Sequence, residues 1–389
     1  MNYFKQVAGL VRINIETLPQ RWTLFATIVI GVACAVGVLV SLLAMGAGAR
    51  QEAMGNVRED RVILMSIGAQ SPMLSDISTD AVPMMRDLPG IRRNSAGQPI
   101  ALPQAQVSMD AIKKADGGPM SFTLGGDGPN FIEYLPEFHL TSGRLFTPGL
   151  HELVASTQCA RQFEGFEVGD KRSMTGGDWT VVGQFKMGSS EGICMALTDV
   201  DTLNSAFGRN SYNTISVMLD SPGSFAVLRK AIQANPAFKV EAKREREVVD
   251  VSIEPLIGML NFLTYFVGTI MALAATLGAV NSLYAIVDSR RRELATLRAI
   301  GFGNTSVVTS ILIESIILAL PGALLGAALA WLLFNGFAAS PFGFSFKLAV
   351  TLPIVGIGIG WALAMGLVGG LLPALRAARI PVTFALRAL

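Results

Sequence analysis

Four long stretches of the chain carry almost no charged side chains. Residues 22–49, 255–287 and 348–375 contain no Asp, Glu, Lys or Arg, and residues 299–346 contain only Glu314. A transmembrane helix needs about 20 consecutive, mostly apolar residues. The pattern therefore predicts four membrane-spanning helices, near residues 22–46, 257–287, 304–337 and 349–375.

The segment that precedes the first span, residues 1–21, is amphipathic. Apolar residues such as Val7 and Leu10 recur among charged residues such as Lys5 and Arg12, which is typical of a helix that lies along a membrane surface. An ordinary juxtamembrane tail is the alternative. The apolar run that follows is longer than the roughly 7–15 residues of a signal-peptide core, so we expect no cleavage there.

Residues 51–254 separate the first two spans and contain 19 basic and 25 acidic residues. This length is sufficient to bury a core of its own. Its pattern predicts strands at 62–67, 179–183, 214–219 and 238–242, helices at 79–88 and 225–234, and a β-rich insertion at about 121–213. The expected fold is an α-helical membrane protein with four transmembrane helices plus a large α+β extracytoplasmic domain between the first and second helices.

Two charge-rich segments connect this domain to the spans. Residues 47–61 follow the first span and residues 241–254 precede the second, and both are poor in turn-forming residues. We expect both to extend the membrane helices as a stalk, with the first span and its stalk assigned to 22–50. Two flexible linkers are the alternative.

Composition narrows the function further. Hydrophobic residues make up 51% of the chain and charged residues 15%, with a net charge of +2, whereas nucleic-acid-binding domains are strongly basic. Two His and three Cys are too few for a His/Cys metal site, and no catalytic residues are expected. Cys159 and Cys194 lie in the extracytoplasmic domain, where a disulfide can form; the sequence leaves their pairing open.

The short connections carry an excess of Lys and Arg. The N-terminal segment, residues 288–298 and the C-terminal tail together hold 10 basic and 3 acidic residues, and cytoplasmic loops carry such an excess. We therefore expect both termini and a cytoplasmic segment at 288–303 on one side, followed by the spans 304–337 and 349–375. The loop 338–348 and the large domain are expected on the other side, and the tail 376–389 in the cytoplasm.

The segment that follows the second span resembles the signature of MacB-like and FtsX-like permeases, a family of ABC transporter membrane subunits (type VII, mechanotransmission). The residues that carry the resemblance are Arg290, Glu293, Leu294, Leu297, Arg298, Ala299, Ile300 and Gly301. Weaker matches lie at Pro89–Ile91, Gly143–Phe146 and Val181–Gly183, in what resembles a MacB-like periplasmic core domain. The resemblance implies an FtsX-like domain in a cell inner membrane.

The residues of this signature also have a structural interpretation that does not depend on the resemblance. On a helix, Leu294 and Leu297 form an apolar ridge beside charged residues, and Gly301 is a typical helix end. We expect this cytoplasmic coupling helix to dock into a groove of a partner ATPase through that ridge. A positive-inside loop that binds nothing is the alternative.

Three further features of the membrane and tail segments are singled out. Pro373, Arg376 and Pro381 are expected to make cytoplasmic tail contacts. Glu314 is a lone intramembrane carboxylate, expected to be a packing or interfacial partner of Arg298 or the tail arginines rather than an ion-coupling site, because relays use several ionisable groups. The small-residue pairs Gly322/Gly326, Gly356/Gly360 and Gly366/Gly370 suit close helix packing within one chain.

MacB carries a fused ATPase, whereas this sequence has no GxxxxGK[ST] motif and only about 21 residues before the first span. We therefore expect a separate ABC ATPase subunit in two copies, which binds ATP and Mg²⁺. A second permease copy is expected to complete a homodimer or a heterodimer with a paralogue. A periplasmic adaptor and an outer-membrane channel are further candidate partners.

The sequence thus predicts a non-catalytic permease subunit of a bacterial inner-membrane ABC transporter that acts in export, efflux or extraction. ATP hydrolysis would drive a conformational change of the periplasmic domain. One alternative is an FtsX-like transducer that transports nothing and activates a periplasmic cell-wall hydrolase. A ligand-sensing receptor without an ATPase is another alternative, but it would leave the coupling signature unexplained.

Overall fold

The computed structural model describes residues 3–16, 22–187, 194–339 and 346–379. The chain divides into two compact units, each described here by itself. The helix bundle comprises Met1–Gly48, Gly258–Phe337 and Lys347–Leu389, and the sheet domain comprises Ala49–Ile257 and Ala338–Phe346.

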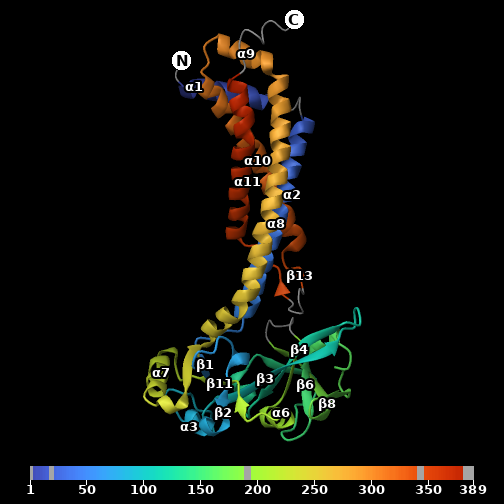
Figure 1. Ribbon diagram of the computed structural model, residues 1–389, viewed down its shortest axis with the longest axis vertical. Coiled ribbons are helices and arrows are strands. Elements are labelled where there is room, and N and C mark those ends of the chain that lie inside the picture. Colours follow the sequence, from blue (N-terminus) through green and yellow to red (C-terminus); the bar gives the residue numbers. More distant parts are fainter. Residues whose placement is uncertain (1–2, 17–21, 188–193, 340–345, 380–389) are drawn as a thin grey trace. The chain divides into compact units, whose positions relative to one another are not determined.

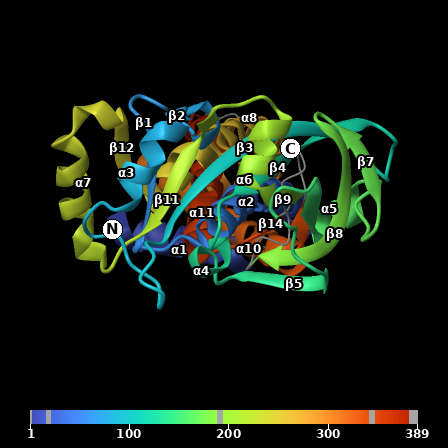
Figure 2. The same ribbon diagram turned by 90° about the horizontal axis from the view of Figure 1, so that it is seen from below.

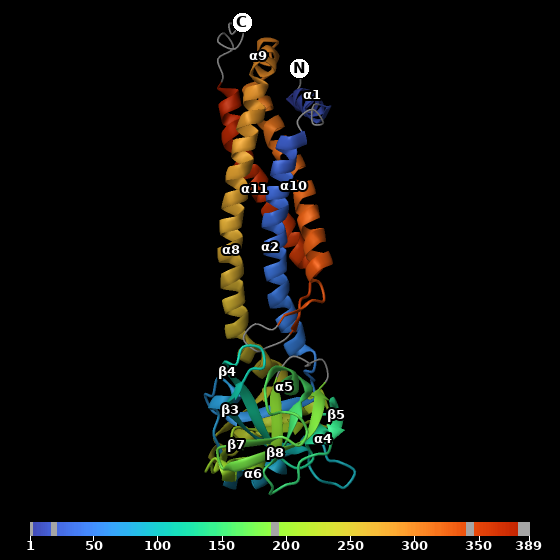
Figure 3. The same ribbon diagram turned by 90° about the vertical axis from the view of Figure 1, so that its right-hand side faces the viewer.

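The helix bundle is built on four long apolar helices, which run side by side in Figures 1 and 3. They are α2 (Trp22–Met54), α8 (Glu245–Ser289), α10 (Asn304–Phe334) and α11 (Leu352–Ala378). Each is long and apolar enough to cross a membrane, so the predicted four-span fold is confirmed. Two shorter helices, α1 (Tyr3–Glu16) and α9 (Arg291–Ala299), belong to the same unit.

Small residues set how closely these helices approach. A Cβ atom at Gly326 would lie 2.4 Å from the carbonyl oxygen of Ala33 in α2, and one at Gly370 would lie 2.5 Å from Ser315 Oγ in α10. Gly356 has nothing within 4 Å of such an atom in the part of the chain that the structure describes. Two of the three predicted glycine pairs therefore pack within the bundle, at Gly322/Gly326 and Gly366/Gly370.

Substitution of Gly326 by alanine is expected to lower the stability of the bundle by about 1–3 kcal/mol, because a methyl group there overlaps the backbone of α2. Gly356→Ala is the matched control. It should leave stability unchanged or raise it slightly, since alanine favours a helix over glycine by about 1 kcal/mol. Thermal unfolding of both variants in lipid nanodiscs measures the difference, and equal midpoints would contradict the packing argument.

The sheet domain centres on one ten-stranded sheet, in the order β12-β1-β11-β3-β4-β9-β6-β8-β5, with β7 paired to β8. The strands are β1 (Arg61–Ser66), β3 (Ala101–Ile112), β4 (Pro119–Asp127), β5 (Phe138–Gly143), β6 (Glu152–Ser156), β7 (Lys171–Met174), β8 (Gly177–Met187), β9 (Met195–Asp199), β11 (Thr214–Met218) and β12 (Val240–Arg244). Short strands are β2 (Ile77–Ser78), β10 (Ser211–Tyr212), β13 (Ala338–Ala339) and β14 (Phe346–Lys347). Figure 2 shows β11, β3 and β4 next to one another.

Helices and 3₁₀ turns connect these strands. The α-helices are α3 (Val82–Arg86), α4 (Phe131–Tyr134), α5 (Thr157–Gln162), α6 (Val200–Ala206) and α7 (Phe225–Gln233). The 3₁₀ turns are η2 (Pro72–Leu74), η3 (Thr79–Ala81), η4 (Pro222–Ser224) and η5 (Pro236–Phe238).

Two apolar cores cover the sheet. The larger core joins residues of α3, α5, α6 and α7 to sheet residues such as Leu64 and Trp179. A second core groups Phe131 and Tyr134 of α4 with Phe138, Phe185 and other sheet residues. Successive side chains of a strand point to opposite faces of the sheet. Both faces therefore carry apolar side chains, and each core buries one of them.

Residues 121–213 do not form a separate insertion. β4 pairs antiparallel with β3 from Gln104↔Asp127 to Ile112↔Pro119, and it pairs parallel with β9 on its other side. The strands of this segment therefore extend the same sheet that contains β1 and β11. This arrangement depends on pairing between strands that are far apart in the sequence, and such pairing leaves no recognisable pattern within a short stretch of residues.

Candidate functional site

The expected coupling segment forms the helix α9, which Figure 3 shows at one end of the bundle. Its end is set by Gly301, whose φ of 107° lies in a region that side chains disfavour. The amide of Gly301 donates to the carbonyl oxygen of Arg298 at 3.0 Å, and that of Phe302 donates to Leu297 at 3.1 Å. The chain therefore turns at Gly301, between α9 and α10.

The leucine ridge of α9 packs onto the chain itself. Leu294 is 7% exposed and belongs to an apolar cluster. Leu297 is partly buried and packs against the same cluster. The other members of the cluster are Leu10 of α1, Val287 of α8, Val307 and Ile311 of α10, and Ala374 and Ala377 of α11. In this structure the ridge anchors α9 and is not the surface that α9 presents, unlike the expectation from the sequence.

Other residues of the signature are exposed. Ile300 is 72% exposed, and Ala299 and Glu293 also lie on the surface. Arg290 is 5% exposed, and its Nε donates to Glu293 Oε2 at 2.9 Å. This ion pair joins the residue that precedes α9 to the first turn of the helix. Ile300 is therefore the most exposed large apolar residue of the signature.

The helix α1 closes the same end of the bundle. Gln6 Oε1 accepts hydrogen bonds from the Gly303 amide at 3.2 Å and from Ser306 Oγ at 2.9 Å. The first backbone amides of a helix have no acceptor within that helix. Gly303 is the N-cap residue of α10, where no local side chain provides a cap, and Gln6 accepts from its amide. Sequence reasoning missed this contact, because nothing near Gln6 in the chain indicates its distant partner.

The sequence singled out four further residues of the helix bundle: Pro373, Arg376, Pro381 and Glu314. Pro373 is buried within α11, and the Arg376 guanidinium lies 5.2 Å from the ring centroid of Tyr284 in α8. Pro381 lies outside the described residues. Glu314 is 6% exposed on the packed side of α10, and its role in packing stays a prediction.

A second polar site lies in the sheet domain, where the chain enters and leaves the long helices. Arg61, the first residue of β1, is 1% exposed. Its guanidinium donates to the carbonyl oxygen of Tyr134 at 2.7 Å and to Glu137 Oε2 at 2.8 Å, and lies 3.6 Å from Glu245 Oε1. We call Arg61, Tyr134, Glu137 and Glu245 the junction cluster.

Glu245 ties together the ends of two long helices. It is the first residue of α8, and its Oε2 accepts a hydrogen bond at 2.8 Å from the amide of Arg58, which follows the end of α2. Arg50 of α2 and Asp250 of α8 add an ion pair at 2.9 Å. Although burial opposes ionisation, the hydrogen bond from Arg61 lowers the pKa of Glu137 below its ordinary value of 4.5.

These contacts correct the expected stalk. The helix α2 ends at Met54 rather than at residue 61, and residues 241–244 belong to strand β12 rather than to a helix. The helical extensions are shorter because residues 241–244 pair with β1, and because residues 55–60, between α2 and β1, lie outside helices and strands. No sequence pattern marked Arg61 as the residue that joins them.

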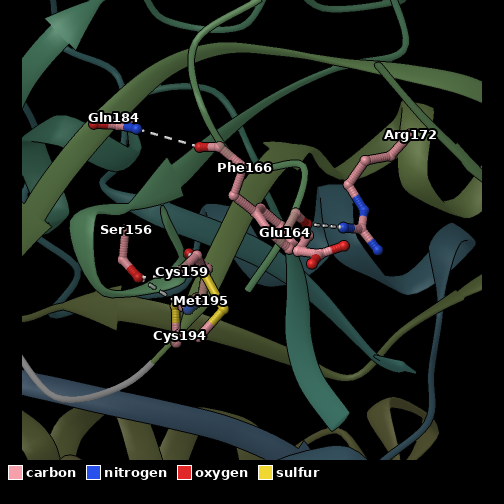
Figure 4. The surroundings of a disulfide bond; sticks show 8 residues. All are labelled: Ser156, Cys159, Glu164, Phe166, Arg172, Gln184, Cys194 and Met195. Atoms are coloured by element: carbon pink, nitrogen blue, oxygen red, sulfur yellow. Dashed lines mark hydrogen bonds between the residues drawn. A yellow bond between two sulfur atoms is a disulfide. The ribbon is translucent and has the colours of Figure 1, made fainter. Parts of the chain in front are cut away.

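Cys159 of α5 and Cys194, just before β9, form a disulfide, one of the two alternatives that the sequence left open. Figure 4 shows the bond beside Ser156, whose Oγ accepts from the Met195 amide at 3.2 Å. Both cysteines belong to the larger apolar core. The bond therefore fixes α5 to the sheet.

Comparison with known proteins gives two family matches. Residues 25–235 match the MacB-like periplasmic core domain, and residues 265–382 match the FtsX-like permease C-terminal domain. The first match alone covers more than half of the chain. Together the two matches include α10 and α11 in full, most of α2, the second half of α8 and most of the sheet domain.

Curated relatives are similar over part of their length. The macrolide export ATP-binding/permease protein MacB of Shewanella sp. (strain W3-18-1) is 25% identical over 181 residues, which cover 44% of this chain and 27% of the relative. The uncharacterized ABC transporter permease YknZ of Bacillus subtilis (strain 168) is 23% identical over 190 residues, covering 48% and 47%. The chain thus spans about a quarter of the first and half of the second.

Among solved structures, the periplasmic region of MacB from Actinobacillus actinomycetemcomitans is 12% identical to this chain. The match covers 52% of this chain and 95% of that structure, with a TM-score of 0.38.

Proposed function

Because this chain belongs to the family of FtsX-like permeases with a MacB-like periplasmic core domain, we propose that it is the permease subunit of an ATP-driven ABC transporter. Two copies would work with a separate ATPase pair that binds ATP and Mg²⁺. Hydrolysis would move the periplasmic domain and so export or extract a substrate. An adaptor protein and an outer-membrane channel would complete the path in a two-membrane cell.

The observation that carries this proposal is the construction of α9. Its buried face, through Leu294, joins it to the cluster formed with α1, α8, α10 and α11, so a force on α9 reaches several helices at once. Its exposed end offers Ile300 to a partner. A short helix fixed on one face and exposed on the other is suited to transmit movement from a docked ATPase.

The orientation follows from the charges. The positive-inside rule puts the arginines around α9 and both termini in the cytoplasm, where an ATPase has access to ATP. The sheet domain would then be periplasmic, as the name of its family domain implies. The junction cluster supports a mechanical role, since it connects the ends of α2 and α8 to the sheet through one buried guanidinium.

Ile300→Asp tests the docking surface. Burial of an isoleucine side chain contributes about 1.5–3 kcal/mol, so we expect the substitution to reduce co-purification of the ATPase and its stimulated hydrolysis at least about ten-fold. Because Ile300 is exposed, the unfolding midpoint of the permease alone should not change. The ATPase is obtained by co-purification with the tagged wild-type permease from its native host.

The matched control is Leu150→Asp, the same kind of change at a leucine that is 51% exposed in the sheet domain. It should leave ATPase binding intact. Wild-type binding and stimulation in the Ile300 variant would refute docking through α9. Failure of any ATPase to co-purify with the wild-type protein would refute the split transporter itself.

A further inference from the structure

The sheet domain contains a cavity of about 160 Å³. It lies on the sheet where strands β11, β3, β4 and β9 are neighbours, beside α4. Its lining combines an aliphatic and thioether wall with a few polar groups. The apolar residues include Ile63, Leu135, Met187, Met195 and Leu197, and the polar ones include Gln104, Thr123, Asp127 and Ser216.

Asp127 is the notable polar group of this lining. The residue ends β4 and is 4% exposed. One carboxylate oxygen, Oδ1, accepts from Gln104 Nε2 at 2.7 Å. Within the described residues, no hydrogen bond or ion pair engages the other oxygen. Burial raises the pKa of Asp127 to about 6, against the hydrogen bond from Gln104, which lowers it.

The neighbours of Asp127 leave its charge uncompensated. Gln104 is held in place because its Oε1 accepts from the hydroxyl groups of Ser216 and Thr214, so its amide group is committed to Asp127. The second carboxylate of the lining, Glu245, already faces Arg61 and the Arg58 amide. A buried carboxylate without a cation is costly, and such groups gather at binding sites.

We propose that this cavity binds a primary alkylammonium group, with the ammonium on Asp127 and its aliphatic stem along Met187, Met195 and Leu197. An ammonium group carries three donors and one positive charge, which matches a lone carboxylate. Charge-assisted hydrogen bonds of this kind are about twice as strong as neutral ones. The apolar wall accounts for an aliphatic stem, because binding removes both surfaces from water.

A metal ion fits this lining poorly. Ca²⁺ takes six to eight oxygen ligands, whereas Asp127 offers one unengaged carboxylate oxygen. In the described part of the chain, no group of three or more His, Cys, Asp or Glu side chains could hold a metal ion. An anion would be repelled by the same carboxylate.

The test uses the full chain in lipid nanodiscs at pH 7.5, without an ATPase, so that its result is independent of the proposed transport function. The probes are n-butylammonium, butan-1-ol and butyrate, which share a stem and differ in charge. Ligand-observed saturation-transfer NMR gives their affinities. We expect butylammonium to bind at least about ten-fold more tightly than butanol, and butyrate not to bind.

Two variants locate the binding. Asp127→Asn should weaken butylammonium binding about ten-fold, whereas Asp110→Asn, which alters an exposed carboxylate on β3 that accepts from Ser121, should not. Thr123→Trp should block the cavity, whereas Ser121→Trp, on the same strand but outside the lining, should leave binding unchanged. Equal binding of butylammonium and butanol, or unaltered binding in both Asp127→Asn and Thr123→Trp, would overturn the proposal.

Discussion

Replacement of Arg61 by methionine is expected to destabilise the sheet domain by about 3–5 kcal/mol, the usual cost of removing one partner from a buried ion pair. Arg61 is 1% exposed, and its loss leaves Glu137 and Glu245 facing each other without a cation. It also removes the hydrogen bond to the Tyr134 carbonyl oxygen. Urea unfolding followed through Trp179 measures the change, in a background where Trp22, Trp331 and Trp361 are phenylalanine.

Two further variants serve as a control for the loss of stability and as a test of force transmission. Arg50→Met breaks an exposed ion pair with Asp250 and should cost no more than about 1 kcal/mol. The triple variant Arg61→Met/Glu137→Gln/Glu245→Gln removes the uncompensated charges and should recover much of the stability. If the junction cluster transmits force, this variant still assembles with the ATPase but loses transport. Full transport in the stable triple variant would refute that role.

Asp127→Asn is expected to have the opposite effect on stability, a gain on the order of 3 kcal/mol at pH 8. The pKa of Asp127 rises from the ordinary 3.8 to about 6 because of burial, and each pKa unit corresponds to about 1.4 kcal/mol. Asparagine keeps an oxygen that can accept from Gln104 but carries no charge. Urea unfolding of the same Trp179 reporter, without any amine present, measures the gain.

The stability gained by Asp127→Asn is expected to depend on pH. The folded protein holds the Asp127 proton more tightly than the unfolded chain does, so ionisation favours unfolding. The penalty is absent below about pH 4, grows as the pH rises towards 6, and is constant above about pH 7. The stability difference between variant and wild type should follow that course. A difference that is the same at pH 4 and pH 8 would contradict the burial of an ionisable group.

The sequence determined the elements whose signals are local. Long charge-free runs can bury their backbone polar groups only as helices in a membrane, so the four spans could be predicted. The strands at β1, β11 and β12 and the helix α7 were also visible, because period-two and period-3.6 patterns differ over a few residues. The helix α9 could be located from its charges and from Gly301.

Only the tertiary structure decided how these elements use their side chains. An amphipathic pattern shows that α9 has an apolar face, but not whether Leu294 faces a partner or the chain's own helices. The pairing of β4 with both β3 and β9 joins residues 121–213 to the main sheet, and strand pairing between distant segments has no sequence period. Hydrogen bonding at the end of β1 likewise decided where the helical extensions stop.

Some residues of the candidate sites could likewise be predicted from the sequence, and others only from the tertiary structure. Signature residues such as Arg290 and Ile300 could be named from the chain, because they lie within about three helix turns of each other along it. Arg61 and Glu245 are separated by most of the sheet domain, and Asp127 lies opposite Gln104 across a strand pair. A buried charge is defined by what surrounds it, and that environment exists only after distant segments have packed together. The tertiary structure alone therefore shows that Arg61 compensates Glu137 and Glu245, whereas no cation faces Asp127 within the described residues.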